Sequence, residues 1–210
     1  MATTVKEIVI PAIKIKEVSF KIVGDSPLIM HAWDPKTKEQ MLNVMMGNAK
    51  TVGREPKDPD REFISSMYWL AGAPTELTEE GFKEAIKSGK ARFGFPSRAF
   101  KAAAVSAGYR AKVTKDKVSM QGAFHIDSEF VEINGTPRKR EDMVRVSGGL
   151  PDIRYRGEFP EWSAIILVKY NSGVVSDKQV INLFNLGGFA CGIGEDRPEK
   201  GGQFGMYHVE

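Results

Sequence analysis

The chain has 210 residues and a formal net charge of +3, from 30 lysines and arginines against 27 aspartates and glutamates. Its 41% hydrophobic and 27% charged residues are ordinary for a globular protein and exclude wholesale disorder. No apolar run approaches the roughly 18 residues needed to cross a bilayer, so we expect no membrane partner. Cys191 is the single cysteine, which excludes disulfides and cysteine-rich metal clusters and makes the cytoplasm the expected compartment.

The first expected element is a strand over residues 14–23, where apolar and polar side chains alternate. Gly24 ends it, and a proline-containing turn leads into the short apolar stretch 28–33. A helix is expected over 34–48, because Asp34 can cap it and methionines recur at helical spacing. Such a methionine-rich helix is more often part of a core than a binding surface, although an exposed face would suit self-association.

A second helix is expected from Asp58 to Leu70, after a polar connector, and a short third helix ends at Lys87. These helices do not alternate with strands. We therefore interpret residues 34–92 as a helical insertion within a single RRM-like domain, residues 1–210, placed between the first strand and the first core helix.

The segments after the insertion complete an alternating pattern of strands and helices. Without the insertion, the order is strand, helix, one or two strands, strand, helix, strand. This order is typical of an α+β fold with the ferredoxin-like split βαβ core to which RNA-recognition motifs also belong. The expected elements are a helix capped by Ser97, one or two strands within 122–133, a basic extended stretch over 137–146, a turn-rich stretch over 147–162, a buried strand over 161–171, a helix capped by Ser176 that Gly187 and Gly188 interrupt or end, and a last strand over 203–210.

The C-terminal stretch 186–210 holds seven of the 21 glycines, between the last helix and the last strand. Glycines there permit positive φ angles and close approach of another backbone, which binding of a phosphodiester chain requires. Arg197 and Lys200 add positive charge, and Phe204 offers a ring on which a base can stack. The alternative interpretation is a loop of tight turns at a hairpin or a subunit contact.

A helix with a glycine pair, then G-x-G with basic residues, then G-x-F-G before a final strand resembles the RAMP superfamily of CRISPR RNA-binding proteins. The matching residues are Gly192, Gly194, Arg197, Gly202, Phe204 and Gly205. The resemblance implies a ferredoxin-like core and RNA binding through this loop. A single core with an inserted segment is more similar to a backbone-type subunit, which coats a strand by stacking copies, than to a two-core nuclease. The segments GDSPLIMHAW and RPEKGGQFG also resemble bacteriophage-encoded proteins, which implies a phage-borne member acting in an infected bacterial host.

A second candidate binding segment is the basic stretch 137–156, in which Tyr155 lies between two arginines. A stacking ring among cations suits single-stranded nucleic acid. The alternative is a solvated hairpin with internal salt bridges. The cations of this stretch are Arg138, Lys139, Arg140, Arg145, Arg154 and Arg156.

The three histidines, His31, His125 and His208, are isolated in the sequence, and no pattern of metal ligands surrounds them. We therefore predict no metal and no cofactor. His31 is nevertheless a candidate base of a metal-independent ribonuclease, with Lys36 and a tyrosine as partners, against the simpler role of a packing residue. Among the adjacent carboxylates, only Glu195-Asp196 lies beside the glycine-rich segment.

These patterns predict a non-enzymatic protein that binds single-stranded RNA or DNA and coats the strand as a homo-oligomer or filament. Two alternatives stay open, a metal-independent endoribonuclease of the same superfamily and a phage protein that binds or inhibits another protein. Acidic residues gather in the insertion, so the near-neutral total charge can conceal a basic groove. The predicted binding residues are Arg138, Lys139, Arg140, Arg145, Arg154, Tyr155, Arg156, Gly192, Gly194, Arg197, Lys200, Gly202 and Phe204.

Overall fold

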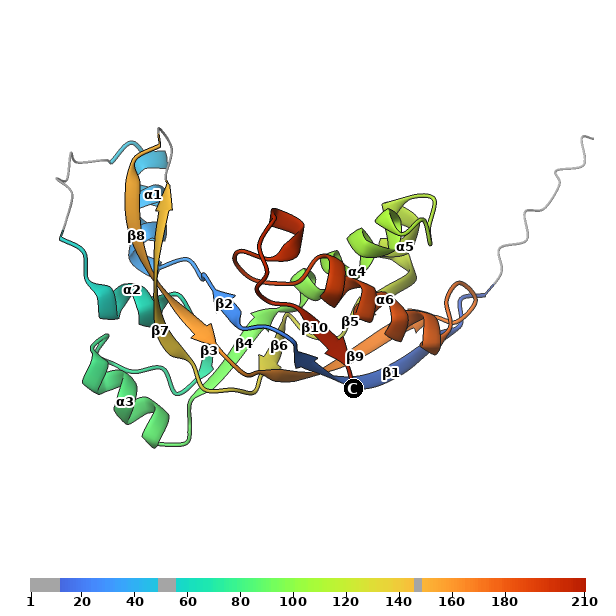
Figure 1. Ribbon diagram of the computed structural model, residues 1–210, viewed down its shortest axis with the longest axis horizontal. Coiled ribbons are helices and arrows are strands. Elements are labelled where there is room, and N and C mark those ends of the chain that lie inside the picture. Colours follow the sequence, from blue (N-terminus) through green and yellow to red (C-terminus); the bar gives the residue numbers. More distant parts are fainter. Residues whose placement is uncertain (1–11, 49–55, 146–148) are drawn as a thin grey trace, which may run out of the picture.

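A four-stranded antiparallel sheet forms the centre of one lobe of the computed structural model, which describes residues 12–48, 56–145 and 149–210 (Figure 1). Every pair of neighbouring strands in this sheet runs antiparallel. The expected first strand is confirmed, with its bounds shifted by one residue. In spatial order the strands are β10 (Tyr207–Val209), β1 (Ile15–Gly24), β9 (Ser163–Asn171) and β5 (Phe124–Ile126).

Two helices cover one face of this sheet, α4 (Ser97–Arg110) and α6 (Asp177–Ala190), and α5 (Lys117–Ala123) lies beside them (Figure 1). In β9 the alternate residues Ala164, Ile166, Val168 and Tyr170 are buried against the helices. Alternation of period two therefore separates a covered face from an open face, as half-buried strands require.

The ends of these helices agree in part with the sequence. Ser176 caps α6 as expected, in a capping box with Gln179. Ser97, in contrast, is the first residue of α4, and Pro96 precedes it without a side-chain cap. The pair Gly187 and Gly188 neither ends nor interrupts α6, which continues to Ala190.

Two three-stranded antiparallel sheets and three helices make up the second lobe (Figure 1). One sheet has the order β2 (Leu28–Met30), β8 (Pro151–Phe159), β7 (Arg138–Arg145), and the other the order β3 (Tyr68–Ala71), β4 (Arg92–Pro96), β6 (Phe130–Ile133). The helices are α1 (Pro35–Met45), α2 (Pro59–Ser65) and α3 (Glu79–Lys87).

The helical interpretation of residues 34–92 is wrong in part, since this segment also holds β3 and the first residue of β4, Arg92. Its residues 49–55 lie outside the described chain. The second helix ends at Ser65, and Tyr68–Ala71 pairs with β4 instead of continuing it. The reason is tertiary: the Trp69 ring packs against Phe93, with centroids 4.6 Å apart, and its indole N–H donates to the carbonyl of Ile64 (2.9 Å). Packing of aromatic rings thus overrides the helical spacing of the sequence.

The turn-rich interpretation of 147–162 is also wrong, because residues 151–159 form the strand β8. This strand pairs with the expected basic strand over the whole length from Arg138 opposite Glu158 to Arg145 opposite Pro151. The two strands form a long hairpin that packs against α2 and extends upward beside α1 (Figure 1). We call it the β7–β8 hairpin.

The structure thus confirms a mixed α+β architecture with several antiparallel sheets. The hydrophobic core continues from one lobe into the other, with Phe95 of β4 against Phe100 of α4 (6.1 Å between centroids) and Trp162 against Tyr207 (6.1 Å). No helix in the part of the chain that the structure describes is long and apolar enough to cross a membrane.

Glycine in α6 lets the helix lie directly on the sheet, which generates a prediction about stability. A Cβ at Gly188 would overlap the carbonyl of Tyr207, whereas a Cβ at Gly122 in α5 would meet no atom within 4 Å. We expect Gly188→Ala to lower the free energy of unfolding by about 3 kcal/mol, because backbone atoms must move apart. Urea denaturation followed by tryptophan fluorescence measures this change.

The matched control is Gly122→Ala, which should raise the free energy of unfolding by about 0.5–1 kcal/mol, since alanine is the better helix former. Equal effects of the two substitutions would show that α6 does not depend on this close approach.

Candidate nucleic-acid interface

The chain between α6 and β10, residues 191–206, forms a loop that packs on the protein's own backbone, and we call it the glycine-rich loop. The amide of Glu195 donates to the carbonyl of Ile29 in β2 (3.0 Å), and the amide of Gly205 donates to the carbonyl of Pro27 (2.8 Å). Gly194 has a φ of +81°, and a Cβ there would lie 2.5 Å from the carbonyl oxygen of Ile29. The loop is therefore held flat against the strand that precedes α1.

The predicted glycines Gly192, Gly194 and Gly202 all approach atoms of this chain. A Cβ at Gly192 would press on Pro198, and one at Gly202 would overlap the backbone of Asp196. Their geometry is that of tight turns, the alternative that the sequence left open. A role of these glycines at a phosphate stays a prediction.

Arg197 connects two parts of the glycine-rich loop. It donates to the carbonyl of Gly194 (3.1 Å) and pairs with Glu199 (3.3 Å). Glu199 also pairs with Arg110 of α4 (3.1 Å). Burial by itself would raise the pKa of Glu199, but the hydrogen bonds from Ser106 and Arg197 outweigh it and lower that pKa, so the carboxylate stays charged. Lys200, by contrast, is exposed and forms no ion pair with a described carboxylate.

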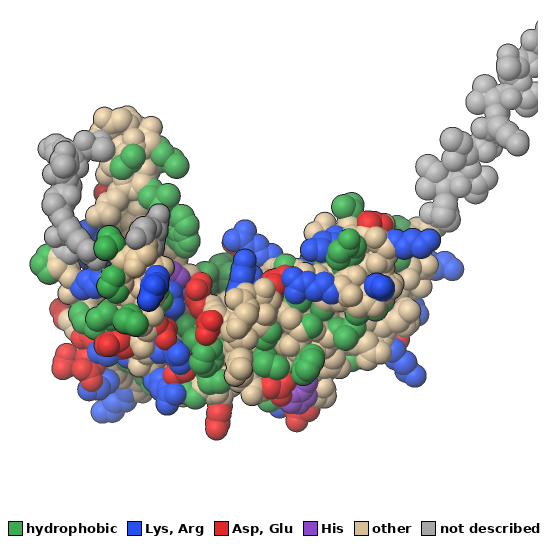
Figure 2. All heavy atoms as spheres, turned by 45° about the horizontal axis from the view of Figure 1, so that its top comes forward, with side chains coloured by type: hydrophobic (Ala, Val, Ile, Leu, Met, Phe, Trp, Pro, Cys, Tyr) green, Lys and Arg blue, Asp and Glu red, His purple; other side chains and the backbone are tan. Residues whose placement is uncertain are grey.

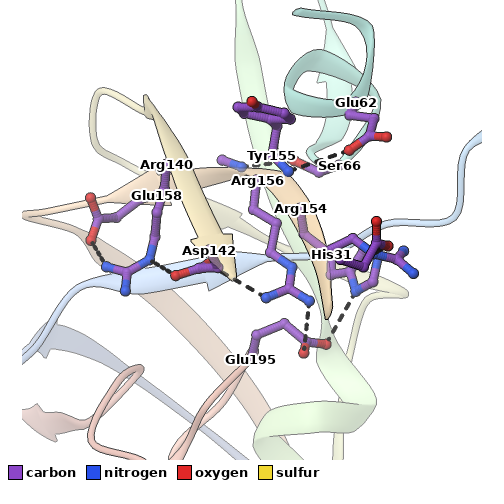
Figure 3. Close-up of polar contacts among 12 residues, drawn as sticks. His31, Glu62, Ser66, Arg140, Asp142, Arg154, Tyr155, Arg156, Glu158 and Glu195 are labelled. Atoms are coloured by element: carbon purple, nitrogen blue, oxygen red, sulfur yellow. Dashed lines mark hydrogen bonds and ion pairs between the residues drawn. The ribbon is translucent and has the colours of Figure 1, made fainter. Parts of the chain in front are cut away.

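At the base of the β7–β8 hairpin, two arginines form ion pairs with one buried glutamate. Glu158, whose side chain is 4% exposed, lies 2.6 Å from Arg138 and 2.8 Å from Arg140. Arg140 also pairs with Asp142 (2.8 Å), as Figure 3 shows, and its guanidinium lies over the ring of Phe204, 4.5 Å from the centroid. Arg140 therefore joins the hairpin to the glycine-rich loop.

Arg156 is the second link between these segments (Figure 3). Its side chain is 12% exposed and lies 3.5 Å from Asp142 and 3.8 Å from Glu195. Glu195 also lies 3.5 Å from Nδ1 of His31, and the hydrogen bond with His31 is the main reason that the pKa of Glu195 is lowered. The Nε of Arg156 is buried without a hydrogen-bond partner.

A groove of about 500 Å³ lies between the hairpin and the glycine-rich loop. Its cations are Arg156, Arg197 and Lys200, and its acids are Asp142, Glu195 and Asp196. Positive and negative groups therefore both line the groove, which is not a purely basic wall.

A neighbouring pocket of about 360 Å³ lies between α1, α2 and β8. Tyr155 and Trp33 line it together with His31, Arg154 and Arg156. The Trp33 side chain is largely exposed and contacts no other aromatic ring among the described residues. Sequence reasoning missed Trp33, because nothing in an apolar stretch shows which member stays outside the core.

Of the other predicted cations of the hairpin, some form ion pairs with carboxylates and one does not. Lys139 pairs with Asp60 of α2 (2.7 Å), and Arg154 pairs with Asp152 (2.8 Å). Arg145, near the tip, forms no ion pair with any carboxylate that the structure describes. The acidic residues of the insertion are thus not segregated from the arginines as expected, since Asp60 faces the hairpin.

The remaining histidines lie away from this region. His208 pairs with Asp25 (2.6 Å) beside β10, and the exposed His125 of β5 contacts Lys101 of α4 (3.1 Å). Across residues 12–48, 56–145 and 149–210, no group of three or more histidines, cysteines and acids could hold a metal ion. Glu195 and Asp196 belong to no such group among these residues.

Comparison with known proteins finds likeness in structure but not in sequence. No family model matches the chain, and no curated protein matches its sequence. Among solved structures, the chain is similar to Cmr6 from Pyrococcus furiosus, with a TM-score of 0.46 and 8% identity over 93% of this chain and 98% of that one. The likeness is distant.

The buried acid at the hairpin base generates a pH-dependent prediction. Burial opposes ionisation of Glu158, but the hydrogen bonds from Arg138 and Arg140 prevail and lower its pKa. The ionised Glu158 therefore contributes its full stabilisation of the fold above the pKa of the unfolded chain, about 4.3. This contribution is lost as the pH falls through the lower pKa of the folded protein. We expect Glu158→Gln to lower the free energy of unfolding by about 2 kcal/mol at pH 7 and much less near pH 3. Urea denaturation at both pH values measures the difference.

Glu132→Gln is the matched control, because Glu132 pairs with Arg92 at the surface. Exposed pairs contribute little, so the control should change the free energy of unfolding by less than about 1 kcal/mol at pH 7. A Glu158→Gln effect that does not shrink at low pH would contradict the assigned charge of this acid.

Proposed function

We propose that this protein binds single-stranded nucleic acid, RNA or DNA, in the groove between the β7–β8 hairpin and the glycine-rich loop. The observation that carries this proposal is the convergence of two separate basic segments, joined by the stack of Arg140 on Phe204. Guanidinium groups that line a groove can pair with phosphates, and an aromatic ring beside them can stack on a base. This combination suits a flexible single strand.

The internal ion pairs do not remove the arginines from binding. A guanidinium has five N–H donors in a fixed fork, and the ion pair of Arg138 engages only its Nε. The side chain of Arg138 is 65% exposed, so its other donors face solvent. Arginines that their acids already hold in place lose less side-chain freedom when they meet a phosphate.

The adjacent pocket supplies a place for a base. Trp33 and Tyr155 offer ring faces at its edge, and a base stacked on an aromatic side chain contributes about 1–3 kcal/mol. Stacking tolerates every base, so this arrangement favours binding without sequence preference.

We further infer that the four-stranded sheet with α4 and α6 is the ferredoxin-like split βαβ core of a RAMP-type protein that coats a strand as a multimer. Support for the core comes from the strand order β10-β1-β9-β5 with antiparallel neighbours. The helices lie in the connections that this topology requires, α4 before β5 and α6 between β9 and β10.

Fluorescence anisotropy with short labelled single strands tests the binding proposal. We expect micromolar or tighter binding that weakens with salt, and a smaller salt dependence for the double variant Arg145→Gln/Lys200→Gln. Each lost phosphate contact should reduce the slope of log K against log salt by about 0.7. Both cations lack an ion pair with a described carboxylate, so their removal leaves the internal network intact.

The charge-matched control is Lys87→Gln/Lys90→Gln at the end of α3, which should leave affinity and slope unchanged. Absent binding, or binding that does not respond to salt, would overturn the proposal and favour a protein that binds another protein.

A second candidate function is metal-independent cleavage of RNA, which the pair of His31 and Glu195 beside Arg156 favours. We propose that the protein is not an enzyme, because these three groups are engaged with one another at the joint between hairpin and loop. Labelled structured RNA incubated with the protein and EDTA should therefore stay intact. Cleavage by the wild type that His31→Ala abolishes would establish the ribonuclease instead.

A further inference from the structure

Trp33 is an aromatic residue that the fold leaves in solvent while it fixes the backbone on both sides. The residue is 60% exposed. The amide of Ala32 donates to the carbonyl of Ser66 at the end of α2 (2.7 Å), and Asp34 caps α1 and pairs with Arg61 of α2 (3.4 Å). Both neighbours of Trp33 are therefore attached to helices, and the indole ring itself stays accessible.

Two pockets share the Trp33 ring. One is the pocket of about 360 Å³ that Tyr155 lines, which we call the Tyr155 pocket. The other has about 390 Å³ and lies between α2, the start of α1 and the chain that follows β3; we call it the Trp69 pocket. Its lining is mostly apolar and includes Ile64, Trp69 and Pro74. Both volumes lie at the lower end of the range of small-molecule sites, about 300–1,000 Å³, so each pocket suits a single base.

The Tyr155 pocket also adjoins the groove proposed for the strand, because Arg156 lines both. The order of the cavities is therefore groove, Tyr155 pocket, Trp69 pocket, with Arg156 shared by the first two and Trp33 by the last two. Figure 2 shows exposed hydrophobic side chains together with Lys and Arg side chains on the lobe that carries the hairpin. A strand that lies in the groove can thus extend past Arg156 to Trp33.

The carboxylates of the two pockets are already engaged by donors of the chain. Glu62 lies 3.6 Å from Lys57 and accepts from the amide of Tyr155 (3.4 Å, Figure 3), and Asp34 is held by α1 and Arg61. An ion-paired carboxylate repels a phosphate less than a free one does. The charged residues and the histidine that line the two pockets are Arg61, Arg154, Arg156, Asp34, Glu62 and His31.

Each pocket also has an arginine that keeps donors for a phosphate. Arg154 of the Tyr155 pocket pairs with Asp152 through its Nε (2.8 Å), and Arg61 of the Trp69 pocket pairs with Asp34 through its Nε (3.4 Å). A guanidinium has five N–H donors, so the terminal amino groups of both arginines can meet phosphates beside the bases.

We propose that the Trp33 ring inserts between two consecutive bases of a bound single strand, one base in the Tyr155 pocket and the next in the Trp69 pocket. The inference rests on the proposed function and states how the same site holds its ligand. The two bases are neighbours in the strand because only the thickness of one ring separates them.

The indole of Trp33 suits this role for two reasons. Its two faces can each stack on a base, and such stacking tolerates every base. Tryptophan also has only two side-chain torsions to fix, so a ring on an already anchored backbone loses little freedom when a strand binds.

A single-stranded hexanucleotide with two adjacent 2-aminopurines between thymines tests the insertion. Two 2-aminopurines stacked on each other give an exciton-coupled circular dichroism band. Purines stack more strongly than thymines, so the pair should occupy the two pockets. We expect this band to disappear when the wild type saturates the strand, because Trp33 separates the two bases. The band should persist when Trp33→Ala saturates the strand.

Fluorescence anisotropy of the same variants gives the second measurement. Trp33→Ala should weaken binding about 30-fold or more, since two stacking contacts are lost. Trp33→Phe keeps a ring, so it should weaken binding less than about tenfold and still abolish the band. The matched control is Phe189→Ala, which removes a 73% exposed ring of α6 that lines neither pocket and should behave like the wild type. Both positions are exposed, so far-ultraviolet circular dichroism should show a native fold in every variant.

Three outcomes would overturn the insertion of Trp33: a band that persists in the strand bound to the wild type, equal affinities of Trp33→Ala and the wild type, or a band that Trp33→Ala also abolishes. The last outcome would assign the separation of the bases to another residue. Failure of the proposed function is distinguishable from these. A wild type that binds no strand contradicts both proposals, whereas salt-dependent binding with an intact band contradicts the insertion alone.

Discussion

Close contact between backbones at the C-terminal end is the constraint on which the rest of this structure depends. Gly187 lets α6 lie on α4, where a Cβ would come within 2.8 Å of the Ala104 amide, and Gly188 lets the same helix lie on β10. Gly194 then holds the glycine-rich loop against β2. Because any side chain at these positions would separate the layers, the glycines determine where the loop lies and which residues it meets.

The polar network of the site follows from that placement. With the loop held on β2, Glu195 lies between His31 and Arg156, and Phe204 lies beneath Arg140. Residues from three distant parts of the chain thereby share one cluster of charges. Such a network costs desolvation energy that its ion pairs offset, and its effect is to hold the hairpin base at a defined distance from the loop.

The hairpin and α1 extend outward from this cluster in the same lobe (Figure 1). The groove for a strand lies between hairpin and loop, and the pocket with Trp33 and Tyr155 has α1 as one wall through Met41.

Local patterns in the sequence determined the strand over 14–23, the helix that follows Asp34, the helix capped by Ser176 and the α+β class, because alternation and caps act within a few residues. Tertiary structure alone decided that 68–71 and 151–159 are strands, since their partners lie far away in the chain. It also decided that the methionines of α1 stay outside the core and that most of the predicted binding cations already face acids of this chain. Burial and ion pairing depend on which distant segments come together in space, and local sequence patterns do not reveal which segments those are.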